Sequence, residues 1–80
     1  MTNSEKYSKV FLQIFSITKV KLKKLKYQSI PQWDSVGHMS MISKLEDEFK
    51  ITLDMDDIVD FSSYEKGKKI LKKYKIKIDK

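Results

Sequence analysis

Asp34 and Ser35 are the residues of this chain best suited to chemistry, and they stand directly before an amphipathic segment. Aspartate and serine are both preferred N-caps, so the plainest interpretation of the pair is that it begins a helix. A helix needs only one cap, however. The unpaired N–H groups of a first helical turn also favour a phosphate ester on a serine there. Gly37 in the same turn costs roughly 0.5–1 kcal/mol relative to alanine and leaves the backbone open to a bulky group or an enzyme surface. Ser35 is therefore either a cap or a modification site.

Few other residues offer catalytic or ligand-binding chemistry. The chain has no cysteine, which excludes disulfides, thiolate metal sites and a cysteine nucleophile. Its one histidine, His38, cannot build a histidine-rich metal site, and no second base is available to complete a triad with Ser35. We expect His38 to face solvent. Gly37 and Gly67 are too few for a glycine-rich phosphate loop. We therefore expect that the chain is not an enzyme and that any thiol chemistry depends on a prosthetic group.

Apolar residues that recur at steps of three and four predict three substantial helices and one short helix. The predicted helices cover about residues 4–18, 35–49, 55–60 and 63–74. Residues 19–33 are expected to form a long loop, because lysines crowd it and Pro31 disfavours helical geometry at Ile30. Residues 75–80 are expected to be a frayed tail. The expected fold class is all-α, a small four-helix bundle in which residues 1–80 form a single domain.

Particular caps and core residues follow from these helices. We expect Asn3 or Ser4 to cap the first helix, and Ser62 with Glu65 to form a capping box for the last. Met41 is expected to be partly exposed. The apolar stripe of the first helix contains Tyr7, Val10, Phe11, Ile14 and Ile17, and that of the second contains Val36, Met39, Ile42, Leu45 and Phe49. We expect Leu22, Leu25, Ile30 and Trp33 to pin the loop to the core, and Tyr64, Leu71 and Tyr74 of the last helix to face inward.

Charge is divided along the chain into three blocks. The formal net charge is +6, yet residues 34–60 hold eight acids and two lysines. Residues 1–33 hold seven lysines and one glutamate, and residues 61–80 hold eight lysines and two acids. A basic chain suggests nucleic acid or an anionic membrane as a partner. All seventeen basic residues are lysine, however, and arginine supplies the bidentate contacts of sequence-specific nucleic-acid recognition, so its absence weakens the nucleic-acid interpretation.

The sequence shows neither a membrane-spanning apolar run nor a secretory signal, and this predicts the location of the protein. No apolar run approaches the ~20 residues needed to span a bilayer. The N-terminal stretch MTNSEKYSKV lacks the basic start and long apolar core of a secretory signal. We therefore expect a cytoplasmic protein without a membrane span, and we expect it to be a monomer.

The stretch WDSVGHMSMISKLEDEF resembles the modification site and second helix of acyl and peptidyl carrier proteins, whose motif is an Asp-Ser pair followed by an apolar residue. ITLDMDDIVDFSSYEKGKKIL is similar to the third and fourth helices of that family, and LKYQSIPQWDS is similar to the loop before its site. Together these stretches extend the resemblance over roughly residues 4–74. Three features depart from the family. The chain is basic overall where such carriers are usually acidic, Val36 stands where leucine is commonest, and Gly67 stands where a bulky apolar residue is expected.

The resemblance implies that Ser35 is the attachment residue for 4′-phosphopantetheine and that Asp34 is its acidic partner. A separate phosphopantetheinyl transferase would move the group from coenzyme A, and its terminal thiol would then hold an acyl or aminoacyl group as a thioester. Further implied partners are an acyl- or aminoacyl-loading enzyme and an acyltransferase or synthase. They would belong to a fatty-acid, polyketide, peptide or surface-glycan pathway, with a specialised pathway favoured. The residues implied to meet partner enzymes are Val36, Met39, Glu46 and Asp47, with Asp56 and Asp57 extending an acidic docking surface.

Two other functions are compatible with the sequence. A small lysine-rich helical protein could bind nucleic acid through residues 19–26 and 66–77, and such binding would weaken steeply with salt. A plain interaction module that has lost its carrier role would keep the fold and lack a group on Ser35. The carrier interpretation predicts an adduct on Ser35, and the other two do not.

Overall fold

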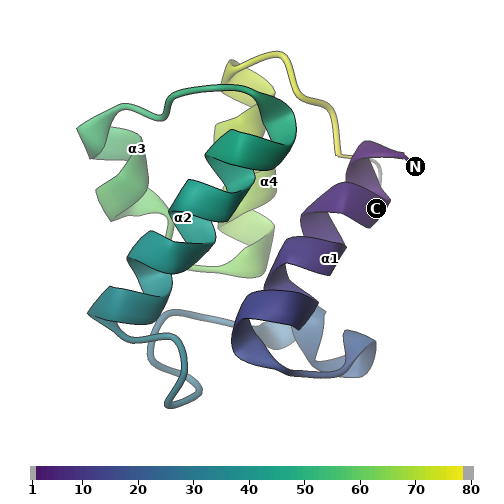
Figure 1. The fold of residues 1–80 in the computed structure, drawn as a ribbon, viewed down its shortest axis with the longest axis vertical. Helices are drawn as coiled ribbons and strands as arrows, with labels where there is room; N and C mark the ends of the chain where they lie inside the picture. Colours follow the sequence, from purple (N-terminus) through teal and green to yellow (C-terminus); the bar gives the residue numbers. More distant parts are fainter. Residues whose placement is uncertain (1, 79–80) are drawn as a thin grey trace.

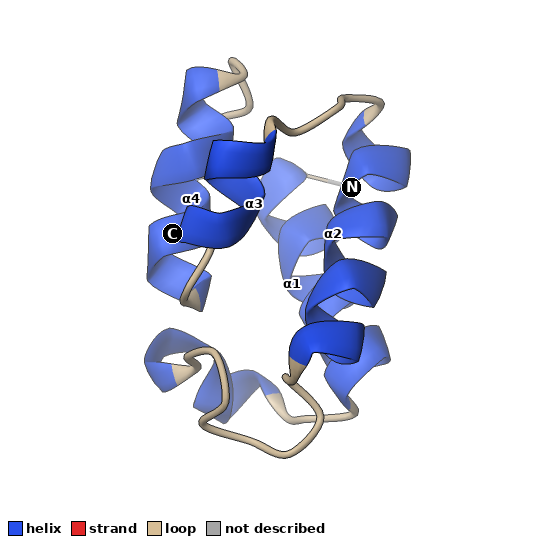
Figure 2. Cartoon of the chain, turned by 90° about the vertical axis from the view of Figure 1, so that its left-hand side faces the viewer, coloured by secondary structure: helices blue, strands red, loops and turns tan. Residues whose placement is uncertain are grey.

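The described part of the chain, residues 2–78 of the computed structural model, contains four α-helices and one 3-10 helix and no strand (Figure 1). In chain order they are α1 (Asn3–Phe15), the 3-10 helix η1 (Lys19–Lys24), α2 (Ser35–Phe49), α3 (Met55–Asp60) and α4 (Tyr64–Lys73). α1 packs against α2, and η1 contacts both α1 and α4. Seen from the side, the segment that precedes α2 closes one end of the bundle (Figure 2). The expected all-α class, with three main helices and short ones, is confirmed.

The first helix begins earlier and ends earlier than the sequence predicts. Its N-cap is Thr2, which forms a capping box with Glu5, so neither Asn3 nor Ser4 is the cap. α1 ends at Phe15 because Ser16 takes a left-handed conformation with φ of 52°. The predicted boundary at residue 18 is therefore wrong.

The predicted long loop, residues 19–33, is partly helical and is tied to the start of α4. η1 occupies its first six residues, Lys19–Lys24. The N–H of Tyr27 donates to the carbonyl of Ser62 at 2.8 Å, and the N–H of Tyr64 donates to the carbonyl of Leu25 at 3.0 Å. Ser63, rather than Ser62, caps α4 through its hydroxyl, which accepts from the N–H of Lys66. The loop that leads into α2 is thus hydrogen-bonded to the start of α4.

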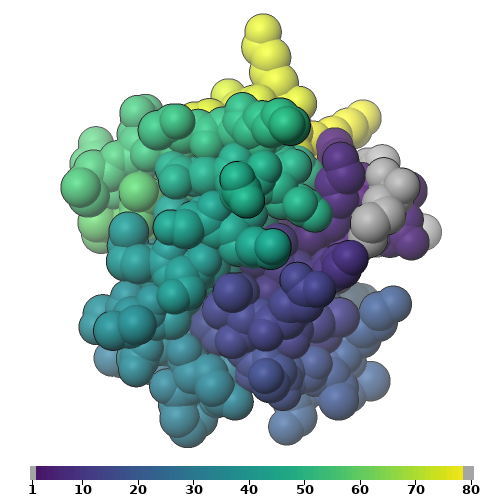
Figure 3. All heavy atoms as spheres, viewed as in Figure 1, coloured from purple at the N-terminus to yellow at the C-terminus, as the bar shows by residue number. Residues whose placement is uncertain are grey.

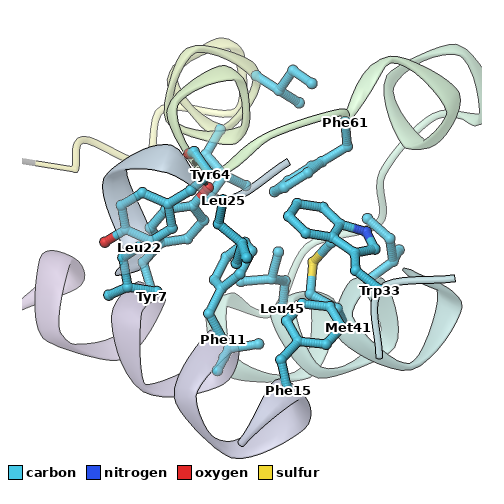
Figure 4. Packing of buried hydrophobic residues seen from close by; sticks show 14 of the residues in the cluster. Tyr7, Phe11, Phe15, Leu22, Leu25, Trp33, Met41, Leu45, Phe61 and Tyr64 are labelled. Atoms are coloured by element: carbon cyan, nitrogen blue, oxygen red, sulfur yellow. Dashed lines mark hydrogen bonds between the residues drawn. The ribbon is translucent and has the colours of Figure 1, made fainter. Parts of the chain in front are cut away.

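The core is centred on aromatic rings from α1, from the loop before α2 and from α4 (Figure 4). Phe11 packs with ring centroids 5.6 Å from Trp33 and 5.0 Å from Tyr64, while Phe15 stacks on Trp33 at 5.2 Å. The Tyr7 hydroxyl donates to the carbonyl of Tyr64 at 2.6 Å, and burial raises the pKa of this phenol well above its ordinary value. This connected cluster joins α1, the loop and α4.

Several predicted core assignments are wrong in detail. Phe15 and Met41 are fully buried, whereas Met41 was expected to be partly exposed. Val36 and Met39, which share the apolar stripe of the second helix and were also implied to meet partners, are 75% and 50% exposed. They lie in the first two turns of α2, outside the buried cluster. The other residues of the predicted apolar stripes and core contacts are buried or half-buried.

The C-terminal segment is packed rather than frayed as far as it is described. Ile76 is buried, and its N–H donates to the carbonyl of Leu71 at 3.1 Å. Asn3 Nδ2 donates to the carbonyl of Lys77 at 3.2 Å, which ties this segment to the start of α1. Ile78 packs partly against the core. The rest of the predicted frayed tail, residues 79–80, lies outside the described residues.

Candidate functional site

The structure divides the Asp34-Ser35 pair into two roles. The carboxylate of Asp34 accepts a hydrogen bond from the N–H of Gly37 at 2.8 Å, so Asp34 is the N-cap of α2. Ser35 is the first residue of the helix and is exposed. Within residues 2–78, no hydrogen bond engages its hydroxyl. The cap is therefore complete without Ser35.

Gly37 is required by a contact inside the molecule. A Cβ at this position would lie 2.0 Å from the backbone oxygen of Gln32 and 3.3 Å from Oδ1 of Asp34. A side chain would displace the loop that leads into α2. The expectation that Gly37 leaves the backbone open to an enzyme surface is therefore wrong, because the space beside it is already taken by the loop.

His38 connects the loop to α3, so it is not the solvent-facing residue that the sequence suggested. Its Nδ1 accepts from the indole N–H of Trp33 at 2.9 Å, and its Nε2 lies 2.7 Å from the carbonyl oxygen of Ile58. Since the indole can only donate, Nδ1 carries no proton and Nε2–H donates to Ile58. The ring also lies 5.5 Å from that of Tyr27. His38 thereby ties the start of α2 to Trp33 of the loop and to Ile58 of α3.

An open groove runs along α2 beside Ser35, with a volume of about 1120 Å³. α2 and α1 share the face of the molecule seen in Figure 3. The residues that line the groove are Ile14, Ser35, Val36, Met39, Ser40, Ser43, Lys44, Glu46, Asp47, Ile51 and Thr52. Ser35 therefore lies along one surface with four of the residues expected to meet partners. These four are Val36, Met39, Glu46 and Asp47.

The predicted acidic residues have different environments. Asp47 and Asp56 are exposed. Glu46 is half-buried, and its Oε2 accepts from the N–H of Leu53 at 2.8 Å, so it also fixes the turn after α2. Asp47 and Asp56 thus keep carboxylates available to a partner, and Glu46 does so in part.

Asp57 does not fit the predicted docking surface. It is 5% exposed, and its carboxylate accepts from Lys73 Nζ at 2.6 Å and from the Tyr74 hydroxyl at 2.5 Å. The hydrogen bonds from Lys73 and Tyr74 lower the pKa of the Asp57 carboxyl below its ordinary value. Its role is to join α3 to α4, because both partners lie at the end of α4.

α3 has two exposed apolar side chains that the sequence patterns did not single out. Met55 and Val59 are 73% and 75% exposed. They lie four residues apart, which places them on one side of the helix. This spacing indicates an apolar side of the helix. In a helix of six residues, it does not indicate whether that side faces the core or the solvent.

Gly67 leaves no room for a ligand beside α4. A Cβ here would lie 2.2 Å from both Cζ of Phe61 and the hydroxyl of Tyr7. The bulky residue that the family pattern favours is replaced by these two rings, which fill the same space. The absence of a bulky side chain at position 67 therefore leaves no empty space beside α4.

Residues 2–78 contain neither a cluster of metal-ligating side chains nor a helix able to cross a membrane. Within residues 2–78, no three or more His, Asp or Glu side chains are grouped as metal ligands. No helix in that part of the chain is long and apolar enough to cross a membrane. Comparisons with family models, curated proteins and solved structures found no match to this chain.

Proposed function

We propose that this chain is an acyl carrier protein that holds a 4′-phosphopantetheine arm on Ser35. The observation that carries the proposal is the division of roles at the start of α2. Asp34 caps the helix, and the exposed Ser35 hydroxyl has no hydrogen-bond partner among the described residues. An exposed hydroxyl that the cap does not use is accessible to a modifying enzyme. The helix order and the packed loop are also those expected of a small carrier-type four-helix bundle.

The residues around Ser35 suit a phosphodiester. The first backbone N–H groups of a helix have no carbonyl partner within it. The N–H of Gly37 donates to Asp34. The N–H groups of Ser35 and Val36, at the start of the helix, remain available to an acceptor. These amides and the helix dipole favour a negative group on Ser35. The adjoining groove gives the remainder of an arm a surface along which to lie.

The chain itself would bind and orient rather than react. When attached, the arm supplies the thiol that holds an acyl or aminoacyl group as a thioester. The chain contributes the tether point at Ser35 and a surface that partner enzymes recognise. Tethering raises the effective concentration of the carried group at each enzyme.

The surface beside Ser35 supports recognition by partners. Val36 and Met39 are exposed apolar side chains within the first two turns of α2, and Asp47 adds an exposed carboxylate further along the groove. Apolar contacts of this kind supply affinity, while the acidic residue favours basic patches and speeds encounter. Met39 also suits a surface that meets several partners, because methionine is flexible and polarizable.

Modification of the purified chain tests the proposal directly. Incubation with coenzyme A and a broad-specificity phosphopantetheinyl transferase should add the mass of one phosphopantetheine, and Ser35→Ala should abolish the addition. Ser40→Ala and Ser43→Ala are matched controls, because both serines are exposed and line the same groove. Both control variants should be modified like the unaltered chain. Absence of an adduct on the unaltered chain, or its persistence in Ser35→Ala, would refute the proposal.

Mass spectrometry of the protein from its native host separates a working carrier from an interaction module that has lost the role. A carrier should have phosphopantetheine, with or without an acyl group, on Ser35. An unmodified native chain that the transferase can modify in vitro would favour the interaction module.

A further inference from the structure

Two adjoining hollows on α1, η1 and α4 share a lysine-rich lining. The larger, about 440 Å³, lies among α1, η1 and α4, and the smaller, about 210 Å³, lies between α4 and the C-terminal segment. Lys68 lines both, so the two form one continuous surface. We call it the basic face, defined by Lys9, Lys19, Lys23, Lys68, Lys69, Lys72 and Lys77.

The positive charge of the basic face is poorly neutralised. Glu5 is the acidic residue in its lining, and that carboxylate already accepts from the N–H of Thr2 at 2.9 Å. Lys68 pairs with Glu65 at 3.2 Å. In the described part of the chain, the other six lysines of the face have no carboxylate partner. Such a surface has a positive potential, which attracts an anionic partner.

Half of the uncharged residues that line the two hollows are aliphatic. Leu12 and Leu22 line the larger hollow, and Ile78 lines the smaller. Val20 lies in η1 next to Lys19 and is 88% exposed. A highly exposed valine among lysines contributes nothing to the core, but it can enter the boundary between lipid headgroups and acyl chains.

We propose that the basic face docks on the surface of an anionic lipid bilayer. Clustered lysines are attracted to anionic headgroups by about 1 kcal/mol each near the surface, and Val20 adds shallow apolar contact. Nucleic acid fits the same surface less well. The chain has no arginine, and the Tyr64 ring that lines the larger hollow is 3% exposed with Lys68 Nζ 4.9 Å from its centroid. No free aromatic face is therefore available there for bases to stack on.

Membrane docking and the proposed carrier role use different surfaces. Ser35 lines the groove along α2 and neither of the two hollows. If the carrier role holds, a chain on a membrane can still present Ser35 to partner enzymes. Docking itself does not depend on that role, so Ser35→Ala should bind vesicles like the unaltered chain.

Vesicle co-sedimentation of the full chain tests the proposal. The chain should bind vesicles of phosphatidylcholine with about 30% phosphatidylglycerol, should not bind phosphatidylcholine alone, and should be released as salt rises from about 0.05 M to about 0.5 M. Lys19→Gln with Lys23→Gln should weaken binding by about thirtyfold, or about fivefold for each lysine. Lys50→Gln with Lys66→Gln removes the same charge from residues outside both hollows and should have little effect.

A second pair of variants tests the apolar contact. Val20→Ser should weaken binding to the anionic vesicles several-fold, and Val59→Ser, at a comparably exposed valine of α3, should not. Circular dichroism checks that each variant is folded. Equal binding to neutral vesicles, equal loss in both lysine pairs, no binding to anionic vesicles, or tighter binding to an RNA oligonucleotide in the same salt would each overturn the proposal.

Discussion

The indole N–H of Trp33 donates to Nδ1 of His38 at 2.9 Å, and this bond fixes which nitrogen of the imidazole holds its proton. Nε2–H is then free to donate to the carbonyl of Ile58, 2.7 Å away. Trp33 is fully buried, so its N–H has no access to water as an alternative acceptor. One side chain in the second turn of α2 thereby joins the loop before Ser35 to the end of α3.

Replacing His38 with alanine should destabilise the protein by about 1–3 kcal/mol, because the indole N–H would be left buried without an acceptor. Denaturant unfolding followed by Trp33 fluorescence measures the free energy. His38→Gln, which keeps one acceptor and one donor, should lose less. An unchanged unfolding free energy in His38→Ala would show that the link contributes no net stability.

Asp34 and Ser35 should differ in their effects on stability. Asp34→Ala removes the cap of α2 and should cost about 0.5–2 kcal/mol, whereas Asp34→Asn keeps a capping oxygen and should cost little. Ser35→Ala should change the unfolding free energy by less than about 0.5 kcal/mol, as for an exposed side chain without partners. Thermal or denaturant unfolding of the three variants gives the comparison. A loss in Ser35→Ala as large as that in Asp34→Ala would mean that the hydroxyl is structural.

Gly67→Ala should destabilise the protein although alanine is the better helix former. The added methyl group would meet Phe61 and the Tyr7 hydroxyl at 2.2 Å, and such overpacking typically costs about 1–3 kcal/mol. The gain in helix propensity is about 1 kcal/mol, so the clash should dominate. The unfolding free energy should fall in Gly67→Ala and stay nearly unchanged in Lys66→Ala, at an exposed position of the same helix. A more stable Gly67→Ala would show that the two rings move aside easily.

Asp57 should contribute to acid sensitivity. Its hydrogen bonds to Lys73 and Tyr74 lower its pKa in the folded state, so its stabilisation is fully present above its ordinary pKa and is lost as the pH falls below about 4 through the lowered value. Asp57→Asn should therefore be less stable than the unaltered chain at neutral pH, and the difference should shrink below about pH 4.

Unfolding free energies measured from pH 7 down to pH 2.5 test this dependence. Asp56→Asn is the matched control, because Asp56 is the exposed neighbouring carboxylate of α3. Its pH profile should follow that of the unaltered chain. If Asp57→Asn shows the same profile as Asp56→Asn, the buried carboxylate does not determine the acid response.

The sequence alone determined those features that depend on near neighbours in the chain. The positions of α2 and α3 follow from apolar spacing and from residues a few places apart, and the Asp34 cap bonds an amide three residues on. Backbone hydrogen bonding in a helix spans four residues, so a local pattern contains this information. The same pattern did not decide which of Asp34 and Ser35 caps the helix, because both residue types are preferred caps.

Only the tertiary structure decided the roles of His38, Asp57 and Gly67. Asp57 meets its partners 16 and 17 residues further on, His38 meets Ile58 20 residues further on, and the space at Gly67 is filled by rings from α1 and from the residue after α3. The basic face likewise combines lysines of α1, η1, α4 and the C-terminal segment, which lie far apart in the sequence. Such contacts form only when separate elements pack together. A periodic pattern fixes which side of a helix is apolar, but it does not fix which distant side chain comes to lie against it.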